Sequence, residues 1–423
     1  MSETAAEEKG RAAAQKSLAQ TTLADRDVIE CPYHTYKKLR EEAPVNKDPV
    51  TGFYTVTCYP DVVKALRDTA TFSSNTGKLL TRPEMRASPA EDHGGYPSVD
   101  TLLTVDPPKH KFYRTPVNKV FSGARVDQMA PYIQQLVHEL IDGFIRDGKC
   151  EFVSQFAWPL PLTIIADQLG VQRSGIADFK QWSDALTLQL NGLATREQGI
   201  AASKLILEFQ KYFARVIEEK RARPTDDIIS DLVRAPMENG LPMNTAELLS
   251  VISQLLVAGN ETTASSIAKG ILLLIQHPDQ MQLVLNDIAL VENLTEEVLR
   301  FEAPVKGLFR VTTCDTALGG VVIPKDAPVM LLFASANRDE AQFEGGETFD
   351  VERKNAASHV AFGQGTHFCL GAMLARKEMN LAFRTILTRM KNLRLAPGHA
   401  EPHHEPSMIL RGLKELHITF DKG

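Results

Sequence analysis

The run from Phe362 to Gly371 combines residue types whose spacing could support metal chemistry. It reads Phe-Gly-Gln-Gly-Thr-His-Phe-Cys-Leu-Gly, and its two inner glycines favour a tight loop ahead of Cys369. The residues that follow, Ala372 to Arg376, have good helix propensity. We therefore expect Cys369 at the N-terminus of a helix, where the helix dipole and free backbone N–H groups stabilise a thiolate. A thiolate presented in this way is a suitable ligand for haem iron.

Other roles fit parts of the same run. Free cysteines are often buried structural residues, but the specific run around Cys369 favours a functional one. His367 and Cys369 could bind zinc, yet a closed zinc site needs four ligands, and no second Cys/His pair has suitable spacing. The glycines also resemble a nucleotide-binding loop, but Phe368 stands where the third glycine is needed. Haem ligation is the interpretation that the spacing favours.

The cysteines give no disulfide or cluster framework. The five are far apart, odd in number and without a Cys-x-x-Cys pair: Cys31, Cys58, Cys150, Cys314 and Cys369. This spacing is not typical of a disulfide framework, an iron–sulfur motif or a structural zinc site. A cysteine that matters for function here acts alone.

The longest helix that the sequence predicts covers residues 244–276. Asn244 and Glu247 resemble a capping box at its start, and His277-Pro278 ends it. The segment is apolar on nearly every side between Val251 and Val257, so we expect it to be buried.

A second chemical motif, Ala258 to Thr263, stands in the middle of this helix. Ala258 and Gly259 leave room for a ligand against the helix. The acid Glu261 followed by the hydroxyl of Thr262 can form a route for protons into an apolar site. A buried threonine also commonly donates to the carbonyl four residues earlier, so this motif alone leaves both roles open.

The elements around these motifs predict a mainly α fold with a small β subdomain. Residues 126–270 are mostly helical in period, with breaks near Gly148, Gly170 and Pro224. Short strands are expected at 52–57, 311–313, 327–333 and 413–420. Residues 1–25 lack apolar periodicity, so we expect a disordered or frayed extension, followed by a single domain over 26–423.

Composition excludes several classes of protein. A net charge of −6 argues against nucleic acid as the main partner. The polar, acidic start offers no signal peptide, and no stretch reaches the roughly 18 apolar residues of a membrane span. We therefore expect a cytoplasmic protein without a membrane anchor, and a monomer.

At the Cys369 loop the chain resembles the cytochrome P-450 family, the haem-thiolate monooxygenases, and its short length is similar to their bacterial branch. The resemblance covers the chain from about Pro32 onward. It implies the cytochrome P-450 fold and a haem b whose iron is ligated by the Cys369 thiolate. It also implies further haem contacts from Ala258, Phe362, Gly363 and Gly371.

The resemblance gives roles to residues whose spacing alone carries little signal. It implies that Glu261 relays protons and that Thr262 donates a proton or holds a water near dioxygen. It implies that the haem propionates are held by His110, Arg114, Arg310 and His367. By spacing alone Glu297 and Arg300 would form a surface ion pair, whereas the family buries this pair with an arginine that Arg353 matches.

The activity that follows is insertion of one oxygen atom from O2 into an apolar small molecule. Because the chain shows no flavin or NAD(P)H fingerprint and no cluster ligands, we expect a separate ferredoxin-like or flavodoxin-like electron donor. Its docking patch is expected to include Lys111, Arg376 and Lys377. The alternative is a haem-thiolate protein that binds or senses a ligand without oxygenating it.

The resemblance also places the walls of a substrate pocket. They are expected at 73–103, 186–193, 257–258, 305–308 and 408–410, which are largely apolar. Such walls suit a terpenoid, a steroid, a fatty acid or an aromatic compound.

Overall fold

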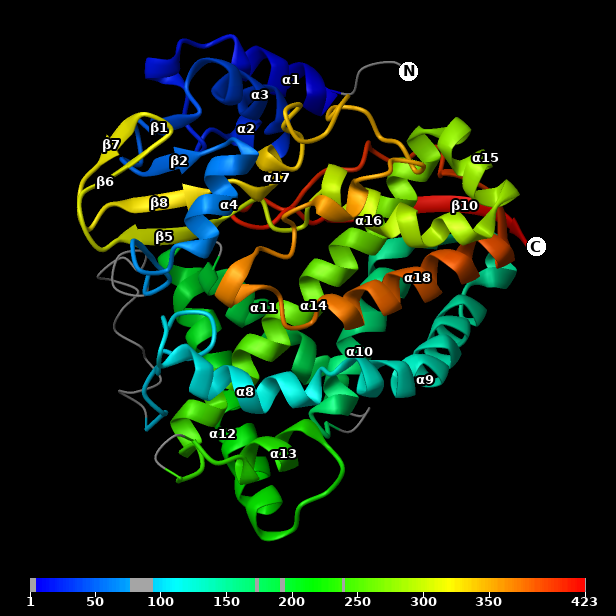
Figure 1. Ribbon diagram of the computed structural model, residues 1–423. Coiled ribbons are helices and arrows are strands. Elements are labelled where there is room, and N and C mark those ends of the chain that lie inside the picture. The colour runs from blue at the N-terminus through cyan, green and yellow to red at the C-terminus, as the bar shows by residue number, and fades with distance from the viewer. Residues whose placement is uncertain (1–4, 77–93, 172–174, 191–194, 238–239, 423) are drawn as a thin grey trace. The chain divides into compact units, whose positions relative to one another are not determined.

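The computed structural model describes residues 5–76, 94–171, 175–190, 195–237 and 240–422 (Figure 1). The chain divides into two compact units. Unit 1 comprises Met1–Phe72, Met129–Leu160 and Glu261–Gly423, and unit 2 comprises Ser73–Gln128 and Pro161–Asn260. That residues 26–423 form one domain stays a prediction.

The main sheet of unit 1 has five short strands in the order β1-β2-β8-β5-β3. They are β1 (Val45–Lys47), β2 (Tyr54–Val56), β8 (Pro328–Leu331), β5 (Leu308–Thr312) and β3 (Phe72–Ser73). β2 runs parallel to β8, while β1 pairs with β2 and β5 with β8 in antiparallel register. Aliphatic side chains of the sheet pack with α4 (Tyr59–Arg67), because Val62 joins Val329 and Leu331 in one buried cluster.

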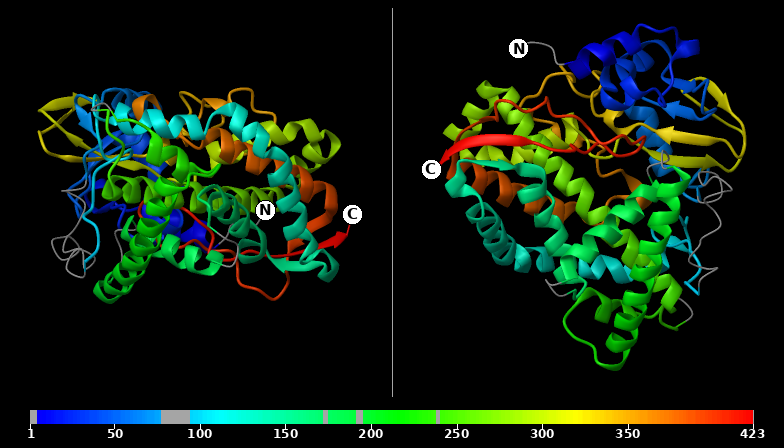
Figure 2. Two further views of the ribbon diagram at one scale, coloured as in Figure 1. Left: turned by 90° about the horizontal axis from the view of Figure 1, so that it is seen from below. Right: turned by 180° about the vertical axis from the view of Figure 1, so that it is seen from behind.

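Two smaller sheets complete the β content of unit 1. β4 (Lys149–Glu151), β10 (His417–Lys422) and β9 (Met390–Leu395) form a three-stranded antiparallel sheet with β10 in the middle. The hairpin of β6 (Thr316–Leu318) and β7 (Val321–Ile323) projects beyond the edge of the main sheet in every view (Figures 1 and 2).

The N-terminal extension, for which composition predicted disorder or a frayed helix, contains a helix over Ala5–Ala14. α1 (Ala5–Ala14) packs against α2 (Arg26–Glu30) and α3 (Tyr33–Glu42). A Cβ added at Gly10 would lie 2.6 Å from the carbonyl oxygen of Cys31, so α1 approaches the chain closely there. Ala13 is buried, and Lys38 Nζ donates to the Ala14 carbonyl over 2.9 Å. Small residues make this contact, so the sequence shows no periodicity of large apolar side chains that would predict the packing of α1.

Four further helices of unit 1 lie between residues 278 and 389, the part of the chain that includes Cys369. They are α15 (Pro278–Asn286), α16 (Val291–Phe301), α17 (Phe333–Ala336) and α18 (Ala372–Arg389). α9 (Gly123–Asp142) and α10 (Pro159–Gln168) each have residues in both units. Short 3-10 turns occupy Leu18–Gln20, Ile145–Asp147, Ile288–Leu290, Ala356–Ser358 and Gly365–His367, and a π-helical turn occupies Val153–Ala157.

The regular elements of unit 2 among the described residues are mostly helices. They are α8 (His110–Val120), α11 (Ile176–Leu190), α12 (Arg196–Ala222), α13 (Ile228–Arg234) and the first half of α14. α11 packs against α12 through aromatic rings, since Trp182 lies 6.1 Å from Phe209 and 6.2 Å from Phe213 between ring centroids. Thr195 and Gln198 form a capping box at the start of α12.

The long helix α14 (Thr245–Gln276) confirms the predicted bounds almost to the residue. Glu247 N donates to Asn244 Oδ1 over 3.0 Å, and Asn244 N donates to Glu247 Oε2 over 2.9 Å, so the capping box is present. Pro278, the first residue of α15, follows directly after His277. Residues of α14 up to Asn260 belong to unit 2, and those from Glu261 belong to unit 1.

The mainly helical class with small sheets is confirmed, and each expected strand has a counterpart in β2, β5, β8 or β10. None of the helices in the described ranges is both long enough and apolar enough to cross a membrane.

Candidate active site

Cys369 lies on a tight loop that leads into α18. Gly363 and Gly365 have φ values of 67° and 69°, which glycine adopts without the steric cost that a side chain would bring. The loop is closed by a hydrogen bond of 2.8 Å from the Cys369 N–H to the Phe362 carbonyl. Gly371 caps α18, so the half-buried Cys369 lies at the N-terminal end of that helix, as the sequence predicted.

Gly371, two residues after Cys369, leaves room for a bound group. A Cβ added there would meet no described atom within 4 Å apart from those of Gly371 itself and its chain neighbours. Among the described residues, no group of three or more His, Cys, Asp or Glu side chains is placed to hold a metal ion. Cys369 would hold the iron of a haem through its thiolate, a site that needs no cluster of His, Cys, Asp and Glu ligands from the protein.

The motif on α14 forms the open part of a mostly buried helix. Ala258, Glu261 and Thr262 share one face through i, i+3 and i+4 spacing. Ala258 is exposed and the other two are half-buried, whereas Leu256 and Ala264, one to two residues beyond the motif, are buried. That this face leaves room for a ligand, as the small residues Ala258 and Gly259 suggest, stays a prediction.

The four expected propionate ligands fall in both units. In unit 2, His110 begins α8 and is buried, which together with the charge of Arg114 lowers the pKa of its imidazole. Arg114, one turn later, donates from Nε to Asn118 Oδ1 over 2.7 Å. In unit 1, Arg310 is a buried residue of β5, and His367 is half-buried in the turn before Cys369.

Two of the expected pocket walls are joined in unit 1. Val305 forms an isolated β-bridge with Leu410, and Lys306 N donates to the Ile409 carbonyl over 2.7 Å. Val305, Leu308 and Leu410 are half-buried, as wall residues would be. The walls expected at 73–103 and 186–193 include residues outside those described.

Glu297, Arg300 and Arg353 form a buried ionic cluster, which confirms the arrangement that the resemblance implies. Arg300 donates to both carboxylate oxygens of Glu297 over 2.7 Å, and Arg353 Nε lies 3.3 Å from the same carboxylate. The side chains of Glu297 and Arg300 are 0% exposed, which excludes the surface ion pair that the spacing alone would suggest. Arg300 also donates to the carbonyls of Asn337, Gly346 and Thr348. The cluster holds α16 to the segment that precedes the cysteine loop.

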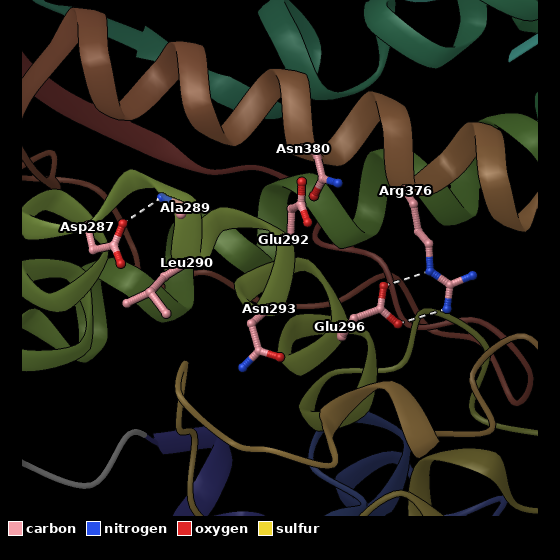
Figure 3. A pocket seen from close by; sticks show the side chains of 8 residues that line it. All are labelled: Asp287, Ala289, Leu290, Glu292, Asn293, Glu296, Arg376 and Asn380. Atoms are coloured by element: carbon pink, nitrogen blue, oxygen red, sulfur yellow. Dashed lines mark hydrogen bonds and ion pairs between the residues drawn. The ribbon is translucent and has the colours of Figure 1, made fainter. Parts of the chain in front are cut away.

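A neighbouring cluster was missed by sequence reasoning. The Glu296 carboxylate accepts hydrogen bonds of 2.6 and 2.8 Å from Arg376 on α18, which Figure 3 shows as two dashed lines. His359 Nε2 lies 3.3 Å from the same carboxylate. The Arg376 guanidinium lies 4.6 Å from the centre of the Phe362 ring, and the His359 ring lies 5.6 Å from it. No spacing rule could find these partners, because they come from three distant segments.

Electrostatics fix the charges of this cluster. Burial raises the pKa of Glu296, but hydrogen bonds from Arg376 and His359 outweigh it and lower the pKa to about 2. Burial lowers the pKa of His359, and its Nδ1 accepts a hydrogen bond from Ala361 N over 3.1 Å. Glu296 is therefore ionised and His359 is neutral near pH 7, with the His359 proton on Nε2.

Comparison with known proteins identifies the family. The model of the family described as Cytochrome P450 matches residues 201–420. The chain is 34% identical over 403 residues to cytochrome P450 monooxygenase PikC of Streptomyces venezuelae, covering 94% of this chain and 93% of the relative. It is also 34% identical over 385 residues to a steroid C26-monooxygenase of Mycobacterium tuberculosis, covering 91% and 92%.

A solved cytochrome P450 structure has a similar fold. The crystal structure of CYP109E1 from Bacillus megaterium in complex with corticosterone superposes with a TM-score of 0.80 at 33% identity, covering 92% of this chain and 98% of that chain. The chain belongs to the cytochrome P450 family. It is a monooxygenase of that family with a haem-thiolate cofactor, which requires O2, an organic substrate and a source of electrons.

Proposed function

We propose that this protein inserts one oxygen atom from O2 into an apolar small molecule and reduces the other atom to water, with two electrons from a separate protein and two protons from solvent. The observation that carries the proposal is Cys369, half-buried at the N-terminus of α18 on a loop closed by the Phe362 carbonyl. When bound, haem supplies the iron that activates dioxygen.

In this proposal the chain's own residues bind, orient and deliver protons. Cys369 donates its thiolate to the iron, and the N–H groups of the loop and helix tune how strongly the sulfur donates electrons. His110, Arg114, Arg310 and His367 hold the propionates, since a guanidinium keeps its charge when buried and binds carboxylates strongly. Ala258, Phe362, Gly363 and Gly371 contact the macrocycle, because small residues and an aromatic ring let it approach.

Glu261 and Thr262 form the proton route. Their half-buried positions on the open face of α14 support this role, because a proton relay needs one end near solvent and the other near the reacting atoms. The hydroxyl of Thr262 holds a proton beside the site of oxygen activation, and Glu261 replaces it from solvent. A proton route has no use in a protein that only senses a ligand, and the relatives are monooxygenases, so the enzyme is favoured over the sensor.

Within the class of terpenoids, steroids, fatty acids and aromatic compounds, steroids are the first substrates to test. One relative is named a steroid C26-monooxygenase, and one structural neighbour was solved with corticosterone. The half-buried apolar residues Val305, Leu308 and Leu410 give walls without a fixed charge, which suits a rigid hydrocarbon skeleton.

The electron donor is proposed to be ferredoxin-like or flavodoxin-like. Of the three residues in the expected docking patch, Arg376 is engaged with Glu296, so part of its charge is already neutralised. Lys111→Glu is therefore a cleaner test than a change at Arg376. It should slow reduction by the donor at low salt, and an unchanged rate would remove the patch from the proposal.

The experiment that tests the function is the carbon monoxide difference spectrum of the reduced protein, followed by turnover. A strongly red-shifted Soret band in the wild-type protein, lost in Cys369→Ser, supports thiolate ligation. Steroid added with donor and O2 should then give a hydroxylated product. Absence of haem from well-folded, haem-supplied protein, or a band at the position of histidine-ligated haem, would overturn the proposal.

A further inference from the structure

We propose that Glu296 is a positioning residue that sets the reduction potential of the haem iron, by holding Arg376 and His359 against the Phe362 end of the cysteine loop. The inference rests on the proposed ligation of iron by Cys369. It assigns a functional role to Glu296 and His359, which lie outside the motifs of the sequence and outside the buried Glu297 cluster, and a further role to Arg376.

The first step is geometric. Glu296 on α16 binds Arg376 on α18 through two hydrogen bonds of 2.6 and 2.8 Å, a bidentate pairing that fixes the plane of the guanidinium. The same carboxylate lies 3.3 Å from His359 Nε2. Figure 3 shows the Arg376 side chain reaching from α18 to Glu296, beside a surface hollow of about 520 Å³. One carboxylate therefore determines where two nitrogen-bearing side chains lie.

The second step connects these side chains to the sulfur ligand. The Arg376 guanidinium and the His359 ring both contact the Phe362 ring, with centre distances of 4.6 and 5.6 Å. The backbone carbonyl of Phe362 in turn accepts the hydrogen bond from Cys369 N over 2.8 Å. Movement of Phe362 would change the hydrogen bond that closes the loop around the sulfur.

The third step concerns charge. Glu296 carries a negative charge and Arg376 a positive one, while His359 is neutral. Reduction of ferric to ferrous iron adds one electron to the site, so a nearby cation raises the potential and a nearby anion lowers it. In the wild-type protein the two charges largely cancel, because they are paired at hydrogen-bond distance. Removal of either charge leaves the other to affect the reduction potential without compensation.

Opposite shifts are therefore expected from the two single variants. Glu296→Gln leaves the Arg376 cation uncompensated and should raise the potential. Arg376→Gln leaves the Glu296 carboxylate uncompensated and should lower it. A shift of the ferrous-to-ferric equilibrium of up to tenfold, about 59 mV for a one-electron couple, is the expected scale, since the Arg376 side chain is 30% exposed and solvent screens it. The double variant should return close to the wild-type value.

The measurement is a potentiometric titration of the haem-loaded protein, read from its absorption spectrum, with the carbon monoxide band recorded for every variant. Glu292→Gln is the matched control, because Glu292 is exposed on the same helix and lines the same hollow (Figure 3). If Glu296 and Arg376 served folding alone, both single variants would shift the reduction potential in the same direction. A larger fraction of the protein would also lack the red-shifted carbon monoxide band. Shifts of equal sign, or no larger than that of Glu292→Gln, overturn the proposal.

A second pair of variants covers the case in which Glu296→Gln does not retain haem. Arg376→Lys keeps the positive charge but not the bidentate pairing, so its potential should lie closer to the wild-type value than that of Arg376→Gln. Equal potentials in these two variants contradict the inference. Failure of the wild-type protein itself to give the red-shifted band would instead reject the haem-thiolate proposal, so the two failures are distinguishable.

Discussion

Replacing Glu297 by glutamine tests the structural interpretation of the buried cluster most directly. The change keeps the size of the side chain and removes its charge. Two guanidinium groups then lose their carboxylate, since Arg300 binds both oxygens at 2.7 Å and Arg353 lies at 3.3 Å. Asp350 N, which donates to Glu297 Oε1 over 2.9 Å, keeps an acceptor in the amide oxygen. The loss should therefore come mainly from uncompensated charge.

The magnitude follows from the burial of the pair. With both side chains 0% exposed, water cannot screen the remaining cations. Breaking a buried ion pair by removing one partner costs about 3–5 kcal/mol. That is a large share of the roughly 5–15 kcal/mol by which proteins are stable, so the variant should fold at low temperature and lose haem readily on heating.

The assay is urea unfolding followed by the helical circular-dichroism signal, with the loss calculated from the shift in midpoint at a common slope. Glu352→Gln, an exposed acid in the same part of the chain, is the matched control and should stay within about 0.5 kcal/mol of the wild-type protein. If Glu297→Gln unfolds at the same urea concentration as this control, the cluster does not hold α16 to the cysteine-loop segment as argued.

Three further outcomes are expected. Thr262→Ala should uncouple donor oxidation from product and raise peroxide, whereas Thr262→Ser should stay coupled; measured coupling that is equal in both would refute the proton route. Gly365→Ala should destabilise the cysteine loop by about 1–2 kcal/mol, because φ is 69° and the new Cβ would lie 3.0 Å from the Leu66 carbonyl oxygen; haem content after purification reports it. Glu296 should add a pH dependence to stability. Its pKa is lowered from 4.5 to about 2, so its contribution is complete above pH 4.5 and is lost as pH falls toward 2. The free energies of unfolding of the wild-type protein and Glu296→Gln should therefore differ at pH 5 and become similar near pH 2.

The sequence predicted those parts of the site whose residues are neighbours in the chain. The Cys369 loop could be predicted from glycines and from helix propensity within ten residues. The bounds of α14 could be predicted from a capping box and a proline. These are local effects, and local effects are visible in a single sequence. The burial of Glu297 and Arg300 is different, because i, i+3 spacing occurs equally on exposed helices; only the family resemblance indicated it.

The remaining features depend on contacts between distant segments. Glu296, His359 and Arg376 meet because α16, the turn before the loop and α18 fold together, and none of the three carries a recognisable spacing. The docking of α1 was missed for another reason. Its contact uses Gly10 and Ala13, and small residues contribute too little to a periodic apolar pattern.

The buried Glu297 cluster has a consequence for the order in which the chain is synthesised. Glu297 and Arg300 leave the ribosome together, but the carbonyls of Gly346 and Thr348 and the guanidinium of Arg353 arrive about fifty residues later. Until then Arg300 lacks several of its final acceptors. Completion of the cluster thus marks the moment at which the nascent chain has reached the segment just before Cys369. Because Cys369 follows Arg353 in the chain, every residue of the cluster has been synthesised before the cysteine of the loop.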